Sequence, residues 1–321
     1  MKLAQRPIEI GLNAAIVAVA DREPLILVVN GNTLPFGPFD PVAHRTFEMG
    51  LRDWVAEQTA LKLGYAEQLY TFGDRGRHAL PGDVGPHLVS VGYLALTRVG
   101  DEPSEALARA GASWRGWYEF FPWEDWRDGR PAILDEALFP ALERWAAEPA
   151  ELTPTKPLSR HERVRLAFGE GGNWDEEHAL DRYELLYEAG IVAEAARDGR
   201  EQAASRTLAA SGVAMRFDHR RILATAISRL RAKLKYRPVV FELMADAFTL
   251  TELQHTVEAI SGRHLHKQNF RRLVESAALV EPTGKSAQPG RGRPAALFRF
   301  RRDVLKERPA PGVRFRSRVS A

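Results

Sequence analysis

Residues 248–300 read FTLTELQHTVEAISGRHLHKQNFRRLVESAALVEPTGKSAQPGRGRPAALFRF, and this stretch predicts two short helices followed by a basic hairpin. Thr249 and Glu252 have the spacing of a capping box, in which each side chain bonds the other residue's unpaired backbone N–H. Gly262 can provide the left-handed residue that ends this first helix. The apolar face of the helix should comprise Leu253, Val257 and Ile260, which recur at helical intervals.

A second helix is expected to begin near His266. Its apolar face should be Phe270, Leu273, Val274 and Ala277. Its outward face carries polar and basic side chains, namely Lys267, Gln268, Asn269, Arg271 and Arg272. The second helix of a helix-turn-helix enters the major groove, where Gln and Asn can read adenine and Arg can read guanine. The pattern therefore predicts base reading by Gln268, Asn269 and Arg271. An ordinary helical hairpin with a solvated basic face explains the helix pair equally well at this point.

The segment after the second helix favours the DNA-binding alternative. Residues 279–281 and 295–300 have the character of strands, and the loop between them carries Lys285, Arg291 and Arg293 among glycines and prolines. Such a loop cannot pack a core, but it can lay cations along phosphates or in a minor groove. The order helix, helix, strand, basic loop, strand is that of a winged helix. Thr249 and Thr251, with Lys267 and Arg272, complete the candidate DNA contacts.

Composition limits the class of protein. The chain has 321 residues, of which 45% are hydrophobic, so it can form two domains or more. It has no cysteine, which excludes disulfides and thiolate metal sites. We find no signal-peptide pattern and no apolar run of membrane-spanning length, so we expect a cytoplasmic protein with no membrane partner.

The charge of the chain is divided unevenly. The whole sequence has 45 Lys+Arg and 42 Asp+Glu, a net charge of +3. Residues 213–321 hold 23 basic and 9 acidic residues, or +14, which leaves −11 for the remainder. This asymmetry favours a polyanionic partner for the C-terminal part alone.

Alternating and helical patterns before residue 150 predict an α/β domain with a mixed sheet. Strands are expected within residues 8–29, with a turn at 21–24, and at 65–72, 86–96 and 114–123. Helices are expected within residues 44–64, ending at Gly64, and at 133–147. Residues 151–212 open with a linker-like Thr/Pro stretch and are expected to form a helical connector, whose apolar stripe comprises Leu180, Tyr183, Leu186, Tyr187 and Ile191. Such a stripe is more typical of a core or a dimer seam than of a ligand site.

A helix is also expected over residues 218–235. Its buried stripe should include Ile222, Leu223, Ile227 and Leu230. Its other face should be a cationic surface made by Arg220, Arg221, Arg229, Arg231, Lys233 and Lys235. That surface can be a solvated face, a phosphate contact, or a relay between the two halves of the chain.

Several stretches resemble a known family. A glycine-bearing loop, a helix with Arg52, Asp53, Glu57 and Gln58, then YTFGDRGR and SVGYLAL, resemble a Nudix domain. FDHRRILATAISRLRAKLKY, FELMADAFTLTELQ, NFRRL and GRPAALFRF resemble the winged-helix half of the Nudix-related transcriptional regulators of NAD metabolism, the NrtR type. The central part resembles the alphaproteobacterial NadQ kind. The resemblance implies a Nudix-like α/β/α sandwich (residues 1–150), a helical connector (151–212) and a C-terminal winged helix-turn-helix with a basic tail (213–321).

The Nudix-like half lacks a complete set of catalytic carboxylates. A working Nudix box holds divalent cations with Glu side chains that follow a fixed spacing. In one alignment, Glu57 and Gln58 occupy the paired-Glu positions of the box, and Arg45 replaces the upstream Glu. In the other, Arg52 and Asp53 occupy its Arg-Glu positions, and His44 replaces the upstream Glu. Neither register leaves a full metal site. We therefore expect no metal, no required cofactor and no catalytic residue. The alternative is a Nudix-type nucleotide pyrophosphatase with an accessory nucleic-acid-binding module.

A pocket without catalysis can still bind a nucleotide. Arg45, Arg75 and Arg77 can bind phosphates, Phe72 can stack on a base or ribose, and Glu57 completes the candidate effector site. Alternatively, the arginines pair with the abundant acids of the domain. The resemblance implies ADP-ribose, NAD or another adenine nucleotide as effector, and a repressor of NAD biosynthesis or salvage genes. We expect a homodimer that binds palindromic double-stranded operator DNA.

Overall fold

The computed structural model describes residues 7–74, 77, 85–100, 104–149, 157–169, 174–287, 294–307 and 312. Its main sheet has the strand order β4-β5-β1-β2-β6, and β3 pairs with β1. The strands are β1 (Ile8–Ala20), β2 (Glu23–Val29), β3 (Phe36–Pro38), β4 (Tyr65–Phe72), β5 (His87–Leu96) and β6 (Ala112–Gly116). β1 runs parallel to β5, and every other named pair in this sheet is antiparallel. The prediction of a mixed sheet is therefore confirmed.

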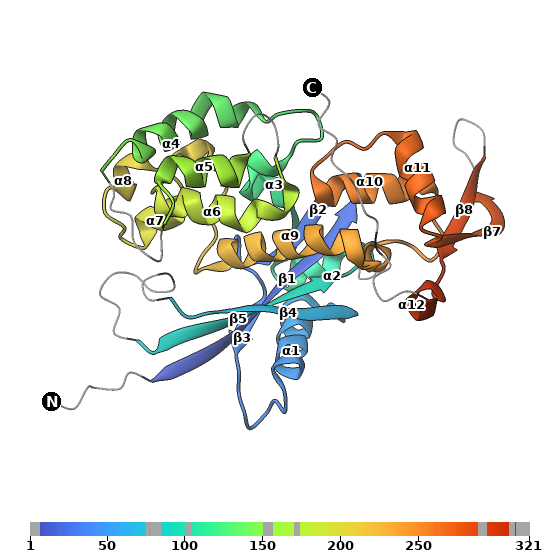
Figure 1. The fold of residues 1–321 in the computed structure, drawn as a ribbon. Coiled ribbons are helices and arrows are strands. Elements are labelled where there is room, and N and C mark those ends of the chain that lie inside the picture. Colours follow the sequence, from blue (N-terminus) through green and yellow to red (C-terminus); the bar gives the residue numbers. More distant parts are fainter. Residues whose placement is uncertain are drawn as a thin grey trace.

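Helices cover both faces of this sheet (Figure 1). α1 (Phe47–Thr59) and α2 (Ser104–Arg109) lie on one face, where Leu51 and Val55 pack with Leu12 and Ile16 of β1. α9 (His219–Tyr236) lies on the other face, where its apolar residues join Ala15, Val17 and Leu94 in a second core. β1 can serve both cores because successive side chains on a strand point to opposite faces. The result is an α/β/α sandwich whose second helical layer is α9.

The helical connector packs on the side of α9 that faces away from the sheet (Figure 1). Its elements are α5 (Arg160–Phe168), η3 (Glu176–His178), α6 (Ala179–Glu188), α7 (Ala193–Arg197), α8 (Ala203–Arg206) and η4 (Ala209–Ser211), and α4 (Phe139–Ala146) packs against α5. The turns α3 (Trp117–Phe120), η1 (Pro122–Glu124) and η2 (Leu134–Leu138) lead from β6 to α4. Tyr183, Leu186, Tyr187 and Ile191 of the predicted stripe are buried in the same core as α9. The stripe is therefore a core face.

The C-terminal part is a winged helix. It comprises η5 (Val239–Leu243), α10 (Leu250–Ser261), α11 (Lys267–Ser276), β7 (Val280–Ala287), β8 (Ala295–Phe300) and α12 (Val304–Glu307). The capping box is confirmed, since Thr249 N donates to Glu252 Oε2 at 2.7 Å and Glu252 N donates to Thr249 Oγ1 at 3.1 Å. Gly262 ends α10 with a φ of 71°. Phe248 and Phe298 exchange two backbone hydrogen bonds, which join the start of α10 to the hairpin.

Two predicted elements of the first domain differ from the structure. The strand expected at residues 114–123 ends at Gly116, because Glu119 caps the Gly116 N–H at 3.0 Å and a helical turn follows. The aromatic residues that follow it are buried at helical intervals instead of alternating. The helix expected to end at Gly64 ends at Ala60, which adopts a left-handed φ of 59° and donates to Ala56 O.

The predicted cationic surface on α9 is wrong. Arg220 and Arg231 are fully buried, with 0% and 1% of their surface exposed. Arg221, Lys233 and Lys235 each form ion pairs with carboxylates of other elements. Sequence periodicity identified the apolar stripe, but it carried no information on acidic partners from elsewhere in the chain. Within the described residues, no helix has the length and apolar character needed to cross a membrane.

Candidate DNA interface and effector region

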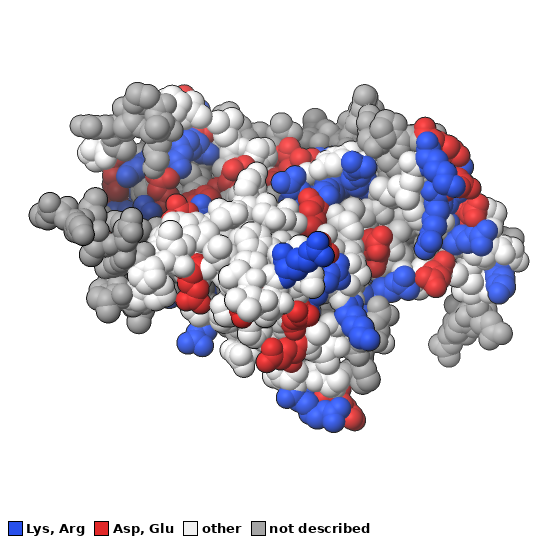
Figure 2. Space-filling view, turned by 90° about the horizontal axis from the view of Figure 1, so that it is seen from below, with Lys and Arg blue, Asp and Glu red and all other residues white. Residues whose placement is uncertain are grey.

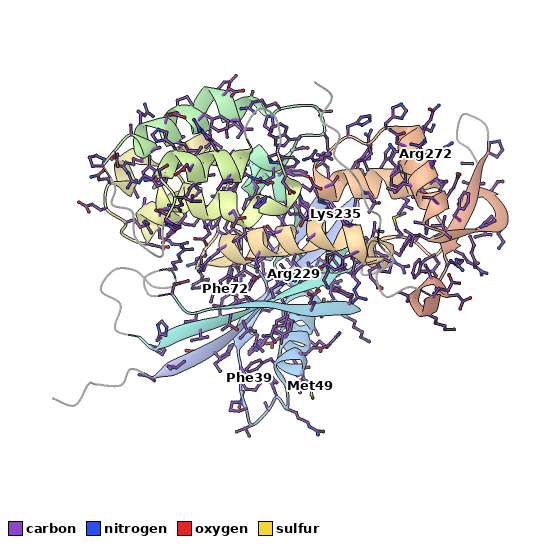
Figure 3. The ribbon with its side chains drawn as sticks, in the orientation of Figure 1. Phe39, Met49, Phe72, Arg229, Lys235 and Arg272 are labelled. Carbon is purple, nitrogen blue, oxygen red and sulfur yellow. The ribbon has the colours of Figure 1, made fainter. Side chains whose placement is uncertain are left out.

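α11 presents a polar face because its apolar residues point inward. Phe270 and Val274 are buried. The predicted DNA-contacting residues of the helix are all exposed: Lys267, Gln268, Asn269, Arg271 and Arg272. In Figure 3, Arg272 lies on α11 at the end of the molecule away from the connector. The structure thus brings these five side chains together on one helical face.

The cations of α11 differ from most cations of the body. Elsewhere on the chain, arginines are typically paired with carboxylates, and basic and acidic side chains are interspersed over the face in Figure 2. In the described part of the chain, neither Lys267 nor Arg271 has a carboxylate within ion-pair distance, and Arg272 donates to Asn269 Oδ1 at 3.3 Å. Unpaired cations on a helix of this kind are available to bind phosphate oxygens or base edges.

The turn between α10 and α11 is organised by two buried side chains of α10. Glu258 accepts from the Leu265 backbone N–H at 2.8 Å and from Gln254 Nε2 at 3.0 Å. Gln254 Nε2 also donates to Leu265 O at 2.7 Å. Because these bonds fix both backbone groups of Leu265, they set the direction in which α11 leaves the turn. Sequence reasoning missed this role, although a Glu among the buried residues of an amphipathic helix is a usable signal.

The remaining predicted DNA contacts lie on other elements of the winged helix or outside the described residues. Thr249 and Thr251 are at the N-terminus of α10, and Thr251 is exposed. Lys285 is exposed on β7. Arg291 and Arg293 lie outside the described residues.

Two of the predicted effector residues lie on the α1 side of the sheet. Arg45 precedes α1, Glu57 is on its outer surface, and both are exposed. Near them, His44 Nε2 is 3.8 Å from Asp53 Oδ2, and Arg52 pairs with Glu48 at 2.7 Å. Among the described residues, no group of three or more His, Asp or Glu side chains is arranged to hold a metal ion.

Two others lie on the α9 side. Phe72 is buried between the sheet and α9, with the Arg221 guanidinium 5.1 Å from its ring centroid (Figure 3). Arg77 makes two hydrogen bonds to Glu184 of α6, at 2.7 and 3.0 Å, and lies 3.8 Å over the Tyr187 ring. Arg75 lies outside the described residues. The four described effector candidates are therefore divided between opposite faces of the sheet and do not converge on one pocket.

Arg77 belongs to an ionic cluster that we call the loop latch, defined as Arg77, Glu184, Asp218 and Arg221. Arg221 Nε is 2.5 Å from Glu184 Oε1, and Asp218 lies 3.2 Å from Arg221 and 3.8 Å from Arg77. Burial raises the pKa of Asp218 to about 7, although the two arginines oppose the shift. The latch joins the loop after β4 to α6 and to the start of α9.

A second cluster, which we call the junction clamp, consists of Tyr118, Glu124, Arg182 and Arg231. Glu124 is fully buried and accepts from Arg182 of α6 at 2.5 and 2.9 Å and from Arg231 of α9 at 2.5 Å. Burial raises the pKa of Glu124, but the two guanidinium groups outweigh it and hold that pKa below its ordinary value. Sequence reasoning missed the clamp because its members come from four separate elements, α3, η1, α6 and α9.

Comparison with known proteins assigns the C-terminal domain. The NrtR DNA-binding winged helix domain matches residues 240–300. These residues form an NrtR-type winged helix.

A curated relative agrees with this assignment. The ADPR responsive transcriptional repressor NtrR of Acinetobacter baylyi is 44% identical over 84 residues, which is 26% of this chain and 33% of that protein. The match thus spans about a third of the relative's length.

Solved structures extend the likeness to the whole fold. NrtR of Shewanella oneidensis, in a crystal structure with a 27mer DNA, has a TM-score of 0.52 at 21% identity and covers 92% of this chain and 95% of that chain. The same protein without DNA gives a TM-score of 0.52 at 20% identity. The Nudix-like sandwich and the NrtR-type winged helix are therefore combined here in the NrtR fold, as the resemblance of the sequence predicted.

Proposed function

We propose that this protein is a transcriptional repressor that binds operator DNA through its NrtR-type winged helix and responds to a nucleotide. The observation that carries the proposal is the exposed, unpaired face of α11 inside that domain. The ADPR response of the Acinetobacter relative supports ADP-ribose as effector, with NAD or another adenine nucleotide as related candidates. The protein would act in the cytoplasm as a homodimer on palindromic operators of NAD biosynthesis or salvage genes.

Base reading and phosphate binding are divided within the proposed interface. Gln268, Asn269 and Arg271 would read base edges, since their amide and guanidinium groups match adenine and guanine. Lys267, Arg272 and Lys285 would bind phosphates together with Thr249 and Thr251, and Arg291 and Arg293 would extend the contacts along the DNA. The Shewanella relative, which shares this fold, was solved on DNA, and that supports the proposal.

We propose that the effector acts at two places on the Nudix-like domain. Arg45 and Glu57 offer exposed polar groups beside α1. Arg75 and Arg77, in the loop next to Phe72, would bind the diphosphate. Because Arg77 is held by Glu184 and Asp218, a diphosphate would have to compete with these carboxylates, and binding there would open the loop latch.

We propose further that the protein does not hydrolyse its effector efficiently. The carboxylates of α1 and its preceding loop are exposed and dispersed, whereas two-metal chemistry needs several of them converging on one cation site. Nudix-type pyrophosphatase activity is the alternative, and it would require the residues around His44 and Asp53 to hold a metal.

One experiment tests both halves of the proposal. A duplex would be selected from a random-sequence pool by the full-length protein, and its affinity would be measured by fluorescence anisotropy with and without ADP-ribose. We expect a specific duplex whose affinity changes when ADP-ribose is added. The same preparation would be assayed for Mg²⁺-dependent hydrolysis of ADP-ribose. Rapid hydrolysis without specific DNA binding would replace the repressor by the pyrophosphatase.

A further inference from the structure

The C-terminal end of α10 is hydrogen-bonded directly by residues that lie outside the winged helix. Tyr118 Oη donates to Ala259 O at 2.7 Å, Arg231 Nε donates to Ile260 O at 2.9 Å, and Trp126 N donates to Gly262 O at 2.8 Å. The last carbonyls of a helix have no intrahelical partner and must be bonded by other groups. In this protein the body of the molecule provides those bonds.

Gly262, at the end of α10, is packed tightly against the junction clamp. A Cβ atom on Gly262 would lie 2.4 Å from Glu124 O and 2.9 Å from both Arg231 Nη2 and Tyr118 Oη. Gly262 ends α10, and Leu265, three residues later, is fixed by Glu258 and Gln254. A displacement of the junction clamp therefore moves the turn and, with it, the first residues of α11.

The clamp and the loop latch are joined by the same two helices. α6 carries Arg182 in the clamp and Glu184 in the latch. α9 carries Arg231 in the clamp and Arg221 in the latch, ten residues and about 15 Å apart along the helix. α6 and α9 pack together in one core, in which Tyr183, Leu186, Ile227 and Leu230 are fully buried. Closely packed helices move as units, so a shift at the latch reaches the clamp.

We propose that Arg231 is a positioning residue for DNA recognition, and that the junction clamp couples the state of the loop latch to the orientation of α11. This inference rests on the proposed function, because it supplies the connection between effector and DNA. An anionic effector that draws Arg77 or Arg221 away from Glu184 changes the balance of charges on α6 and α9. The change is transmitted through Arg182 and Glu124 to Arg231, and from Arg231 to the carbonyl of Ile260.

The decisive test compares two fully buried arginines of α9. Arg231→Lys keeps the charge but loses the planar fork that joins Glu124 to Ile260 O. Arg220→Lys is the matched control, because Arg220 bonds Glu194 and Phe120 O and, among the described residues, makes no hydrogen bond or ion pair with α10 or α11. The readout is the ratio of affinities for the selected duplex with and without ADP-ribose, measured on full-length protein. We expect Arg231→Lys to move this ratio toward one by roughly two- to thirtyfold and Arg220→Lys to leave it unchanged.

A second pair of variants makes smaller changes, so the inference can still be tested if Arg231→Lys does not fold. Tyr118→Phe removes the hydrogen bond to Ala259 O and the weaker one from Arg231 Nη2 at 3.5 Å. We expect it to move the ratio toward one by roughly two- to tenfold. Tyr183→Phe removes a buried hydroxyl that has no hydrogen-bond partner among the described residues, and it should have no effect. Thermal unfolding and ADP-ribose affinity are measured for each variant to separate coupling from stability.

The outcomes separate the inference from the proposed function. If the wild-type protein shows a ratio above or below one, and the clamp variants match their controls, the inference is overturned while the repressor stands. If the wild-type protein selects no duplex, or its ratio is one, the proposed function fails and the coupling fails with it. A ratio that moves toward one in Arg231→Lys and Tyr118→Phe, but not in their controls, supports coupling through the junction clamp.

Discussion

Burial and two neighbouring arginines shift the pKa of Asp218 in opposite directions. Only 3% of the residue is exposed, and it faces Arg77, Arg221 and Glu184 within the loop latch. Burial disfavours its charged form more strongly than the two arginines favour it, so its pKa rises from 3.8 to about 7. The latch therefore contains a group whose charge changes near neutral pH.

This shift predicts a pH dependence of stability. The folded protein retains the Asp218 proton up to about pH 7, whereas the unfolded chain releases it near 3.8. The Asp218 contribution is therefore fully present below about pH 4 and is lost as the pH rises toward 7. Urea unfolding at several pH values should show that the free energy of unfolding of Asp218→Asn, relative to wild type, rises by a few kcal/mol over this range. A constant difference between the two proteins would contradict the assignment.

Gly262 offers a second test at the scale of the residue. Gly262 and Gly284 have similar left-handed φ values of 71° and 76°, but nothing lies within 4 Å of a Cβ atom on Gly284. Alanine at either position suffers backbone strain of about 1 kcal/mol. Gly262→Ala must also push against Glu124 O, so we expect it to cost several kcal/mol of unfolding free energy and to weaken DNA binding. Equal losses in the two variants would show that the clamp is not tightly packed.

At the scale of the element, α11 and α9 show what a sequence pattern can and cannot specify. The apolar faces of both helices were predicted correctly, because they follow from spacing alone. The six cations of α9 were placed on the surface, yet Arg220 and Arg231 are buried, because Glu194 and Glu124 reach them from distant parts of the chain. The strand predicted at 114–123 failed for a related reason: a run of aromatic residues fits a buried strand or a buried turn of helix, and the Glu119 cap decides.

The two kinds of DNA contact proposed for α11 predict different mutational effects. Arg271→Ala should cost about 1–3 kcal/mol on the selected duplex and relax the base preference at one position. Lys267→Ala should weaken binding to all duplexes alike and lower the slope of log affinity against log salt by about 1. Arg163→Ala, on α5 and paired with Glu188, serves as the control and should bind DNA like the wild-type protein. Identical behaviour of Arg271→Ala and Lys267→Ala across sequences would remove Arg271 from base reading.

At the scale of the whole molecule, the net charges of +14 in residues 213–321 and −11 in the remainder agree with the proposal that only the C-terminal part binds DNA. The winged helix and its order of elements were predictable from the sequence, since caps, glycines and apolar spacing are local signals. The effector region was less predictable: Arg77 and Phe72 lie on the α9 side of the sheet, whereas Arg45 and Glu57 lie beside α1. The loop latch and junction clamp depend on contacts between distant residues, which no local pattern contains.

The proposed repressor must link the binding of its nucleotide to the binding of DNA. Linkage requires that ADP-ribose change the affinity for the selected duplex by the same factor by which the duplex changes the affinity for ADP-ribose. Both affinities can be measured by titration calorimetry on full-length protein at one salt concentration. We predict that both titrations give the same factor, a change in affinity of roughly 5- to 150-fold. Affinities for ADP-ribose and DNA that are independent of one another would contradict the account.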